Sequence, residues 1–178
     1  MTTINSVEFV KSKIRDILDF PVKGIVFKDI TTVLRDKEGY REIIKFLTEK
    51  FQDKNIDYIA GIESRGFIFG AALAYELGAG FVPLRKPGKL PGETLSQEYQ
   101  LEYGTDTLQI HKDAIEAGKR VVIVDDLLAT GGTAGAACNL IRQTGAEVVA
   151  AAFVIELQDL NGRAKMPENV ETVSMIVY

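Results

Sequence analysis

The amino-acid sequence predicts an α/β fold with a central, mostly parallel sheet flanked by helices. Two segments, 58–84 and 121–157, each run from an apolar strand through a polar loop and a helical stretch to another apolar strand. Their apolar runs are too uniform to alternate, which is typical of strands covered on both faces. The helical stretches suit βαβ crossovers, so we expect ligands to bind beyond the carboxyl ends of these strands.

The amino-terminal part predicts two helices. Val7, Val10, Ile14, Ile17 and Leu18 recur at helical spacing, and the helix should stop at Phe20-Pro21 because a residue before proline disfavours the helical region. A second amphipathic helix is marked by apolar positions at Tyr40, Ile43, Ile44, Leu47 and Phe51. Residues 21–30, "PVKGIVFKDI", read as an irregular connection between them.

The segment between the two βαβ units predicts a hairpin. Residues 85–105 hold most of the turn formers. Leu101 and Tyr103 alternate before Gly104-Thr105, and Leu108 and Ile110 alternate after it. A long polar excursion beside a ligand site favours a lid.

Composition restricts the class of protein. A chain of 178 residues that is 46% apolar suits a single domain, and a net charge of -4 argues against holding nucleic acid or an anionic membrane. The lone Cys138 excludes an internal disulfide and fits a reducing compartment. The first residues are too polar for a signal peptide, and no apolar run reaches the roughly 18 residues of a membrane span. We expect a soluble, cytoplasmic protein that binds small molecules.

The segment "VVIVDDLLATGGT", residues 121–133, carries the most specific chemistry. Its loop, Ala129 to Thr133, leads into a helix whose free amide groups and dipole favour an anion such as phosphate. Taken alone, a short Gly-rich loop is as well explained as a tight turn. Asp125 and Asp126 favour a sugar-phosphate site over a simple tight turn, because two hydrogen-bond acceptors suit the vicinal hydroxyls of a ribose. The pattern lacks Gly-Lys-Ser/Thr and GxGxxG, so it is neither a Walker loop nor a dinucleotide fingerprint.

The same segment resembles the phosphoribosyl pyrophosphate motif of type I phosphoribosyltransferases. The chain is most similar to the adenine-using branch of that family, since "PVKGIVFKDI", "GIESRGFIFG", "FVPLRKPGKLPGET" and "LEYGTD" occur in the same order. Family members that act on 6-oxopurines carry an acid where this chain has Ala129. The resemblance implies one type I phosphoribosyltransferase domain over residues 1–178, with a small hood from about 1–35 and the C-terminal region, and a flexible lid at about 90–107.

The resemblance also implies a reaction. Adenine attacks C1′ of phosphoribosyl pyrophosphate to give AMP and pyrophosphate, with Mg2+ held mainly by the substrate and water rather than by direct protein ligands. The ribose 5-phosphate group would be bound by Asp125, Asp126, Ala129, Thr130, Gly131, Gly132 and Thr133. Pyrophosphate would be bound by Glu63, Ser64, Arg65, Arg85, Lys86 and Lys89. Adenine would be bound by Val26, Phe27, Lys28 and Leu157. The catalytic set would be Glu102, Tyr103 and Arg65, with Glu102 handling the proton at N7 of adenine.

The residues themselves leave several alternatives open. A solvated loop explains Lys89 as well as phosphate contact does, and Phe27 also suits a core position. Without the resemblance, Glu102 would be a surface acid beside a packing tyrosine. The resemblance further implies a cis Glu63-Ser64 peptide and a homodimer in which Arg85 reaches across the interface. Lys23 departs from the family pattern, in which proline is common, and this affects loop stiffness more than selectivity.

Other function classes fit less well. A phosphoribosyl pyrophosphate-binding regulator would need a DNA-binding domain or a basic face, and a magnesium-dependent phosphatase would need Asp-x-Asp-x-Thr/Val. The remaining alternative is another purine phosphoribosyltransferase, for hypoxanthine, guanine or xanthine, which Ala129 disfavours. His111 is interpreted as structural or exposed, because no nucleophile elbow accompanies it. Cys138, among Ala136, Ala137 and Leu140, is interpreted as a small packing residue.

Overall fold

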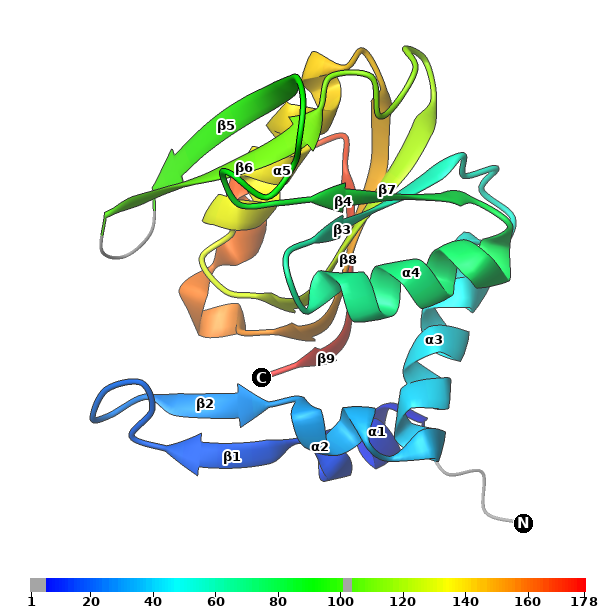
Figure 1. Cartoon of the computed structure of the whole chain (residues 1–178). Coiled ribbons are helices and arrows are strands. Elements are labelled where there is room, and N and C mark those ends of the chain that lie inside the picture. Colours follow the sequence, from blue (N-terminus) through cyan, green and yellow to red (C-terminus); the bar gives the residue numbers. More distant parts are fainter. Residues whose placement is uncertain (1–5, 101–103) are drawn as a thin grey trace. The chain divides into compact units, whose positions relative to one another are not determined.

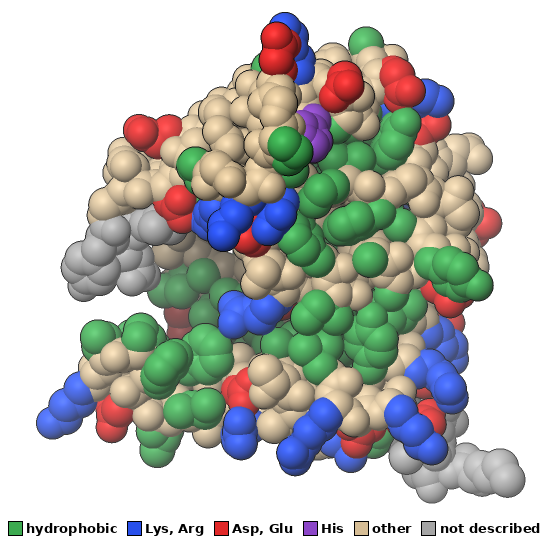
Figure 2. Space-filling view, in the orientation of Figure 1, with side chains coloured by type: hydrophobic (Ala, Val, Ile, Leu, Met, Phe, Trp, Pro, Cys, Tyr) green, Lys and Arg blue, Asp and Glu red, His purple; other side chains and the backbone are tan. Residues whose placement is uncertain are grey.

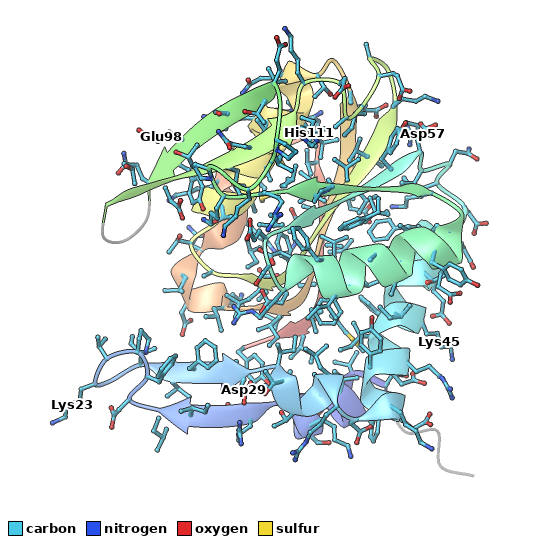
Figure 3. The ribbon with its side chains drawn as sticks, in the orientation of Figure 1. Lys23, Asp29, Lys45, Asp57, Glu98 and His111 are labelled. Atoms are coloured by element: carbon cyan, nitrogen blue, oxygen red, sulfur yellow. The ribbon has the colours of Figure 1, made fainter. Side chains whose placement is uncertain are left out.

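The computed structural model describes residues 6–100 and 104–178, and the chain divides into two compact units, Met1–Phe46 and Leu47–Tyr178. The first unit contains α1 (Ser6–Lys13), β1 (Arg15–Leu18), β2 (Val26–Asp29), α2 (Thr31–Leu34) and the start of α3 (Lys37–Phe51). Strands β1 and β2 form an antiparallel hairpin, and Lys23 lies in the turn at its tip (Figure 3).

The predicted helix from Val7 to Leu18 is wrong in its second half. The helix ends at Lys13, and Arg15–Leu18 is strand β1. Cross-strand partners explain the change: Arg15 is ion-paired with Asp29 across the hairpin, and Lys28 Nζ lies 2.8 Å from Asp16 Oδ1. These contacts stabilise an extended backbone that helical spacing alone does not anticipate. The same pairing makes Val26–Asp29 a strand, so the irregular connection predicted for residues 21–30 is wrong at its end.

Helix α3 confirms the second predicted helix. Its apolar positions Ile43, Leu47 and Phe51 are at most 1% exposed, as expected for the inner stripe of an amphipathic helix. The helix begins three residues before Tyr40, and Asp36 Oδ1 accepts the amide of Gly39 at 2.9 Å. That bond satisfies one of the amides left free at a helix amino terminus.

The second unit contains a five-stranded sheet in the order β4-β3-β7-β8-β9, and every neighbouring pair is parallel (Figure 1). This confirms the predicted α/β class and parallel sheet. The sequence pattern did not predict β9. The strands are β3 (Tyr58–Ile62), β4 (Gly80–Leu84), β7 (Arg120–Leu128), β8 (Glu147–Glu156) and β9 (Glu171–Val177), and the crossover helices are α4 (Gly66–Leu77) and α5 (Gly132–Gln143).

The direction in which the chain's connections run across the sheet reverses between β3 and β7. From β3 the chain crosses through α4 to β4, whereas from β7 it crosses through α5 to β8 on the other side. Right-handed crossovers in opposite directions place α4 and α5 on opposite faces of the sheet (Figure 1). Such a switch point leaves a crevice at the carboxyl ends of the two central strands. Both predicted loop motifs follow those two strands.

The predicted hairpin is present as β5 (Thr94–Gln100) and β6 (Thr105–His111), paired antiparallel from Thr94 with His111 to Gln100 with Thr105. Its first strand begins earlier than the alternation at 101–103 suggested. His111 lies in the second strand (Figure 3), where its Nε2 is 2.7 Å from the carbonyl oxygen of Pro91. Residues 101–103 lie outside the described part of the chain.

The connection from β8 to β9 forms two short 3-10 helices, η1 (Gln158–Leu160) and η2 (Gly162–Lys165). The amide of Leu157 donates to the carbonyl oxygen of Leu128 at 2.9 Å, so this connection starts beside the end of β7. In the described ranges 6–100 and 104–178, no helix has the length and apolar character needed to cross a membrane.

Candidate active site

The two adjacent aspartates belong to strand β7 and do not follow it. Pairing of Leu127 with Ile155 and Leu128 with Glu156 extends the strand two residues beyond Asp126, so the loop starts at Ala129. Successive side chains of a strand point to opposite faces. Asp126 is 6% exposed and Asp125 is half-buried, and both line a cavity of about 480 Å³.

Asp125 occupies an environment that disfavours its charge. Burial, followed by the negative charge of Asp126, raises the pKa of the Asp125 carboxyl well above its ordinary value. One of its oxygens nevertheless accepts the backbone amide of Asp126 at 2.8 Å. The site therefore holds a carboxyl that gains from any ligand donating hydrogen bonds to its ionised form, such as a hydroxyl group.

The Gly-rich loop lines the same cavity. Its lining includes Arg65, Phe153 and the predicted phosphate-binding residues Ala129, Thr130, Gly131 and Thr133. Gly131 has a φ of +78°, a left-handed conformation that glycine adopts without a steric penalty, and α5 begins at the next residue. The free amide groups of the first turn of α5 therefore lie near the carboxyl end of β7, where the cavity is, and such amide groups suit an anion.

The turn after β3 brings Arg65 to the aspartates. The Glu63-Ser64 peptide is cis, which confirms that prediction. A Cβ at position 66 would lie 2.5 Å from the carbonyl oxygen of Val124, so glycine is needed for α4 to start this close to β7. Arg65 Nε lies 2.5 Å from Asp126 Oδ2. A predicted pyrophosphate ligand and a predicted ribose ligand therefore form an ion pair.

The residues after β4 form a second ion pair. Arg85 Nε and Nη2 each lie 3.3 Å from an oxygen of Glu63, and the Lys86 amide donates to Glu63 Oε2 at 2.8 Å. The backbone hydrogen bond from Lys86, with the charge and hydrogen bonds of Arg85, lowers the pKa of Glu63. Lys89 is exposed. Figure 2 shows lysine and arginine side chains gathered on this face of the molecule.

Two polar residues that the sequence interpretation did not assign, Tyr99 and Asp106, also line the site. Lys86 Nζ donates to the hydroxyl of Tyr99 at 2.6 Å and forms an ion pair with Asp106. Burial lowers the pKa of Lys86, but these two partners outweigh burial and raise it overall. Asp106 is the last residue of "LEYGTD", so the motif contained the signal, but nothing in it shows that this aspartate meets Lys86.

These side chains surround a second cavity of about 370 Å³ next to the first. Arg65, Asp125, Asp126 and Thr133 line both cavities, which places the acid pair between them. The remaining lining of the second cavity is Ile62, Glu63, Ser64, Lys86, Tyr99 and Asp106. The first cavity alone includes the loop residues Ala129 to Gly131, and the second alone includes Glu63, Lys86 and Asp106.

Comparison with known proteins identifies the family. The family model described as "Phosphoribosyl transferase domain" matches residues 29–176. The chain belongs to the phosphoribosyltransferase family. It is 62% identical over 159 residues to an adenine phosphoribosyltransferase of Cyanothece sp., a match that covers 89% of this chain and 94% of the relative.

Solved structures of phosphoribosyltransferases agree in fold. The adenine phosphoribosyltransferase of Rhodothermus marinus has a TM-score of 0.92 at 53% identity, and the match covers 97% of this chain and 98% of that one. The enzyme of Saccharomyces cerevisiae, solved with D-2,5-dideoxy-2,5-imino-altritol 1,6-bisphosphate and adenine, has a TM-score of 0.90 at 42% identity, covering 96% and 98%. This phosphoribosyltransferase therefore has the type I fold that the sequence predicted.

The residues predicted to bind adenine in this phosphoribosyltransferase lie in both units. Val26, Phe27 and Lys28 belong to β2 of the first unit, where the ring of Phe27 packs edge-to-face on Phe20 at 5.2 Å. Leu157 follows β8 in the second unit. Adenine binding by these four residues stays a prediction. The predicted catalytic residues Glu102 and Tyr103 lie outside the described residues, so their roles also stay predictions.

Proposed function

We propose that this chain is a pentosyltransferase that moves the phosphoribosyl group of phosphoribosyl pyrophosphate onto adenine, releasing AMP and pyrophosphate in purine salvage. The observation that carries the proposal is the pair of adjoining cavities with Asp125 and Asp126 between them. Adenine as the base is supported by Ala129, which replaces the loop acid of the 6-oxopurine enzymes, and by relatives named adenine phosphoribosyltransferase.

The first cavity suits ribose 5-phosphate. The amides of residues 129–133 and the start of α5 would surround the phosphate, and the carboxylates of Asp125 and Asp126 would accept hydrogen bonds from the ribose diol. Holding the sugar at both ends fixes the position of C1′. A fixed reacting centre lowers the entropic part of the barrier when a base attacks.

The second cavity suits the departing pyrophosphate. Loss of this anion from C1′ leaves an oxocarbenium-like centre, so the site must stabilise negative charge on the leaving group. Arg65 and Lys86 line this cavity, and Arg85 pairs with its lining residue Glu63. Arg65 and Lys86 are likewise paired, with Asp126 and Asp106 respectively. Pyrophosphate would replace these carboxylates as the partner of the cations. Before substrate binds, the carboxylates neutralise the cations and so reduce the repulsion between them.

Magnesium ion, when bound to the diphosphate, supplies charge neutralisation for the leaving group. The chemistry of the site fits it, because Asp125, Asp126 and Glu63 offer the carboxylate oxygens that accept hydrogen bonds from magnesium-bound water. We propose that the ion arrives with the substrate and is held mainly by phosphoribosyl pyrophosphate and water.

The family resemblance assigns adenine binding to Phe27, to Leu157 and to the backbone groups of Val26 and Lys28. It assigns catalysis to Glu102 and Tyr103, with Glu102 handling the proton at N7. Replacing Glu102→Gln keeps the side-chain shape but removes the titratable group. Turnover should fall by about 10²–10⁴ in steady-state assays. Turnover within a factor of three of the parent protein would remove Glu102 from the mechanism.

The decisive experiment supplies phosphoribosyl pyrophosphate and magnesium with each nucleobase in turn and measures nucleotide formation by chromatography. AMP from adenine, with little product from hypoxanthine, guanine or xanthine, is the expected result. Nucleotide from those bases but not from adenine would establish the alternative purine specificity. Binding of phosphoribosyl pyrophosphate without any product would favour a regulator.

We also propose a cytoplasmic homodimer. Support comes from the family resemblance, from the single buried Cys138, and from apolar side chains that α4 and β4 leave exposed, such as Tyr75 at 86% and Ile68 at 40%. Light scattering coupled to gel filtration should give twice the chain mass of 19.6 kDa. A monomer mass at micromolar concentration would contradict the dimer.

A further inference from the structure

The phosphate-binding loop is packed against a segment that the proposed reaction does not use. A Cβ at Gly131 would overlap the carbonyl oxygen of Gly162, and a Cβ at Gly162 would overlap the carbonyl oxygen of Ala129. Both clashes are with backbone atoms, which cannot rotate away as a side chain can. Glycine at both positions therefore permits the loop 129–131 and the start of η2 to lie backbone against backbone.

The same segment also contacts the first turn of α5. A Cβ at Gly135 would lie 3.1 Å from the carbonyl oxygen of Lys165, so the end of η2 lies close to the helix that follows the loop. Residues 162–165 thus touch the loop at its start and α5 one turn later. Movement of η2 would displace the amides that surround the cavity.

An ion pair fixes η2 to the sheet. Arg163 Nε and Nη2 each lie 2.7 Å from an oxygen of Glu156, the last residue of β8, and Arg163 Nη1 donates to the carbonyl oxygen of Thr172 in β9 at 2.9 Å. The Glu156 side chain is only 5% exposed. Two parallel hydrogen bonds of this kind restrict orientation as well as distance.

Contact with Arg163 also matters for the charge state of Glu156. The hydrogen bonds from the guanidinium, despite the opposing effect of burial, lower the pKa of Glu156. The carboxylate is therefore ionised at neutral pH and keeps the pair intact. Glu156 neighbours Leu128 in the β7–β8 ladder, so the anchor point lies one residue from the start of the phosphate loop.

We infer that Gly162 and the Glu156–Arg163 pair are positioning residues, which hold the loop 129–132 in the conformation that binds the 5′-phosphate of phosphoribosyl pyrophosphate. They do not touch the substrate and act through the loop. The inference rests on the proposed function for the identity of the substrate. It implies that phosphate affinity depends on a segment about thirty residues downstream of the motif.

The test compares Gly162→Ala, Arg163→Met and Arg163→Lys with the parent protein. Gly162→Ala should raise KM for phosphoribosyl pyrophosphate about 10- to 100-fold, because the loop must shift to admit the methyl group. Arg163→Met should raise it about tenfold, and Arg163→Lys should recover part of that loss because it keeps the charge but not the double hydrogen bond. KM for adenine should change less than threefold in all three variants.

The matched control is Arg120→Met. Arg120 Nη1 lies 3.0 Å from Glu147 Oε2, an arginine–glutamate pair that joins β7 and β8 at their amino-terminal ends, the opposite end of β8 from Glu156. Its loss should leave both KM values unchanged. Equal effects of Arg120→Met and Arg163→Met, or parallel losses for both substrates, would overturn the inference by showing a general effect on stability.

Calorimetric titration with ribose 5-phosphate separates this inference from the proposed reaction. The parent protein should bind it, and Gly162→Ala should bind at least tenfold more weakly. If Gly162→Ala does not fold, the two Arg163 variants decide by the same titration. Parent protein that binds ribose 5-phosphate but makes no AMP would refute the proposed reaction alone. Unchanged ribose 5-phosphate affinity in folded Gly162→Ala or Arg163→Met would refute the positioning role.

Discussion

Two kinds of segment at the carboxyl ends of neighbouring strands suit anions in different ways. The loop after β7 has small residues around Gly131 and offers backbone amides, whereas the turn after β3 and the residues after β4 offer Arg65, Arg85 and Lys86. Both face anionic groups in the proposed reaction. The first keeps its partner for the whole reaction and the second must release its partner.

The difference shows how each loop is stabilised without substrate. The backbone loop packs against η2 and carries no charge that needs a partner. Each of the three cations is already paired with a carboxylate, so substrate binding exchanges one charged partner for another. Substitutions that add a side chain should therefore weaken substrate binding most in the backbone loop. Substitutions that remove a charge should weaken it most in the cationic segments.

The largest effect should come from Gly131→Ala. The substitution places a side chain at φ +78° and overlaps the Gly162 carbonyl, so kcat/KM for phosphoribosyl pyrophosphate should fall at least about 100-fold. Gly118→Ala is the control, because Gly118 has a φ of +79° and open space around it. Both variants carry the left-handed penalty of about 1–2 kcal/mol, measured by urea unfolding. If both lose activity equally, conformational strain and not packing explains the loss.

The next effect tests the cationic turn. Arg65→Met removes the charge-assisted contact to pyrophosphate that the proposed function assigns to Arg65, and it leaves Asp126, with a side chain 9% exposed, without its ion pair. Pyrophosphate affinity in the reverse reaction should fall about 10- to 100-fold, while ribose 5-phosphate affinity should change far less. Equal losses for both ligands, measured by calorimetry, would mean that Arg65 acts through Asp126 on the ribose side.

Asp125→Asn should have a smaller effect, and it should change substrate affinity and thermal stability in opposite directions. Loss of the carboxylate should weaken phosphoribosyl pyrophosphate about tenfold, and adenine far less. Because the pKa of Asp125 is raised, ionisation costs the folded state stability as pH rises above the ordinary carboxyl value of about 3.9. The variant should therefore melt at a higher temperature than the parent protein at pH 7, by about 2–4 °C per kcal/mol, and not below pH 3. A lower melting temperature at pH 7 would contradict the assigned environment of Asp125.

The smallest effect belongs to Lys89→Ala. Lys89 is exposed, and exposed charge pairs contribute about 0.2–1 kcal/mol, so KM for phosphoribosyl pyrophosphate should rise no more than about fivefold. The rise should vanish in 0.5 M salt if the contact is a screened surface interaction. An unchanged KM at low salt would show that Lys89 is a solvated loop residue. Only Arg65, Arg85 and Lys86 would then remain as proposed pyrophosphate-binding cations.

Local sequence determined the elements whose signal lies within a few residues. Uniform apolar runs predicted β3, β7 and β8, the spacing of Ile43, Leu47 and Phe51 predicted α3, and the Asp-Asp and Gly-Gly pattern predicted the cavity at the end of β7. These predictions hold because burial on both strand faces and the free amides at a helix start are local properties of the chain.

Only the tertiary structure decided features that depend on a distant partner. Arg15–Leu18 has helical spacing but is extended, because residues 26–29 supply a strand to pair with it. Asp106 contacts Lys86, and Gly162 contacts Gly131, although each pair is separated by 20 or more positions in the sequence. Such contacts arise where separate segments of the chain meet, and no periodicity within one segment encodes which partner will be there.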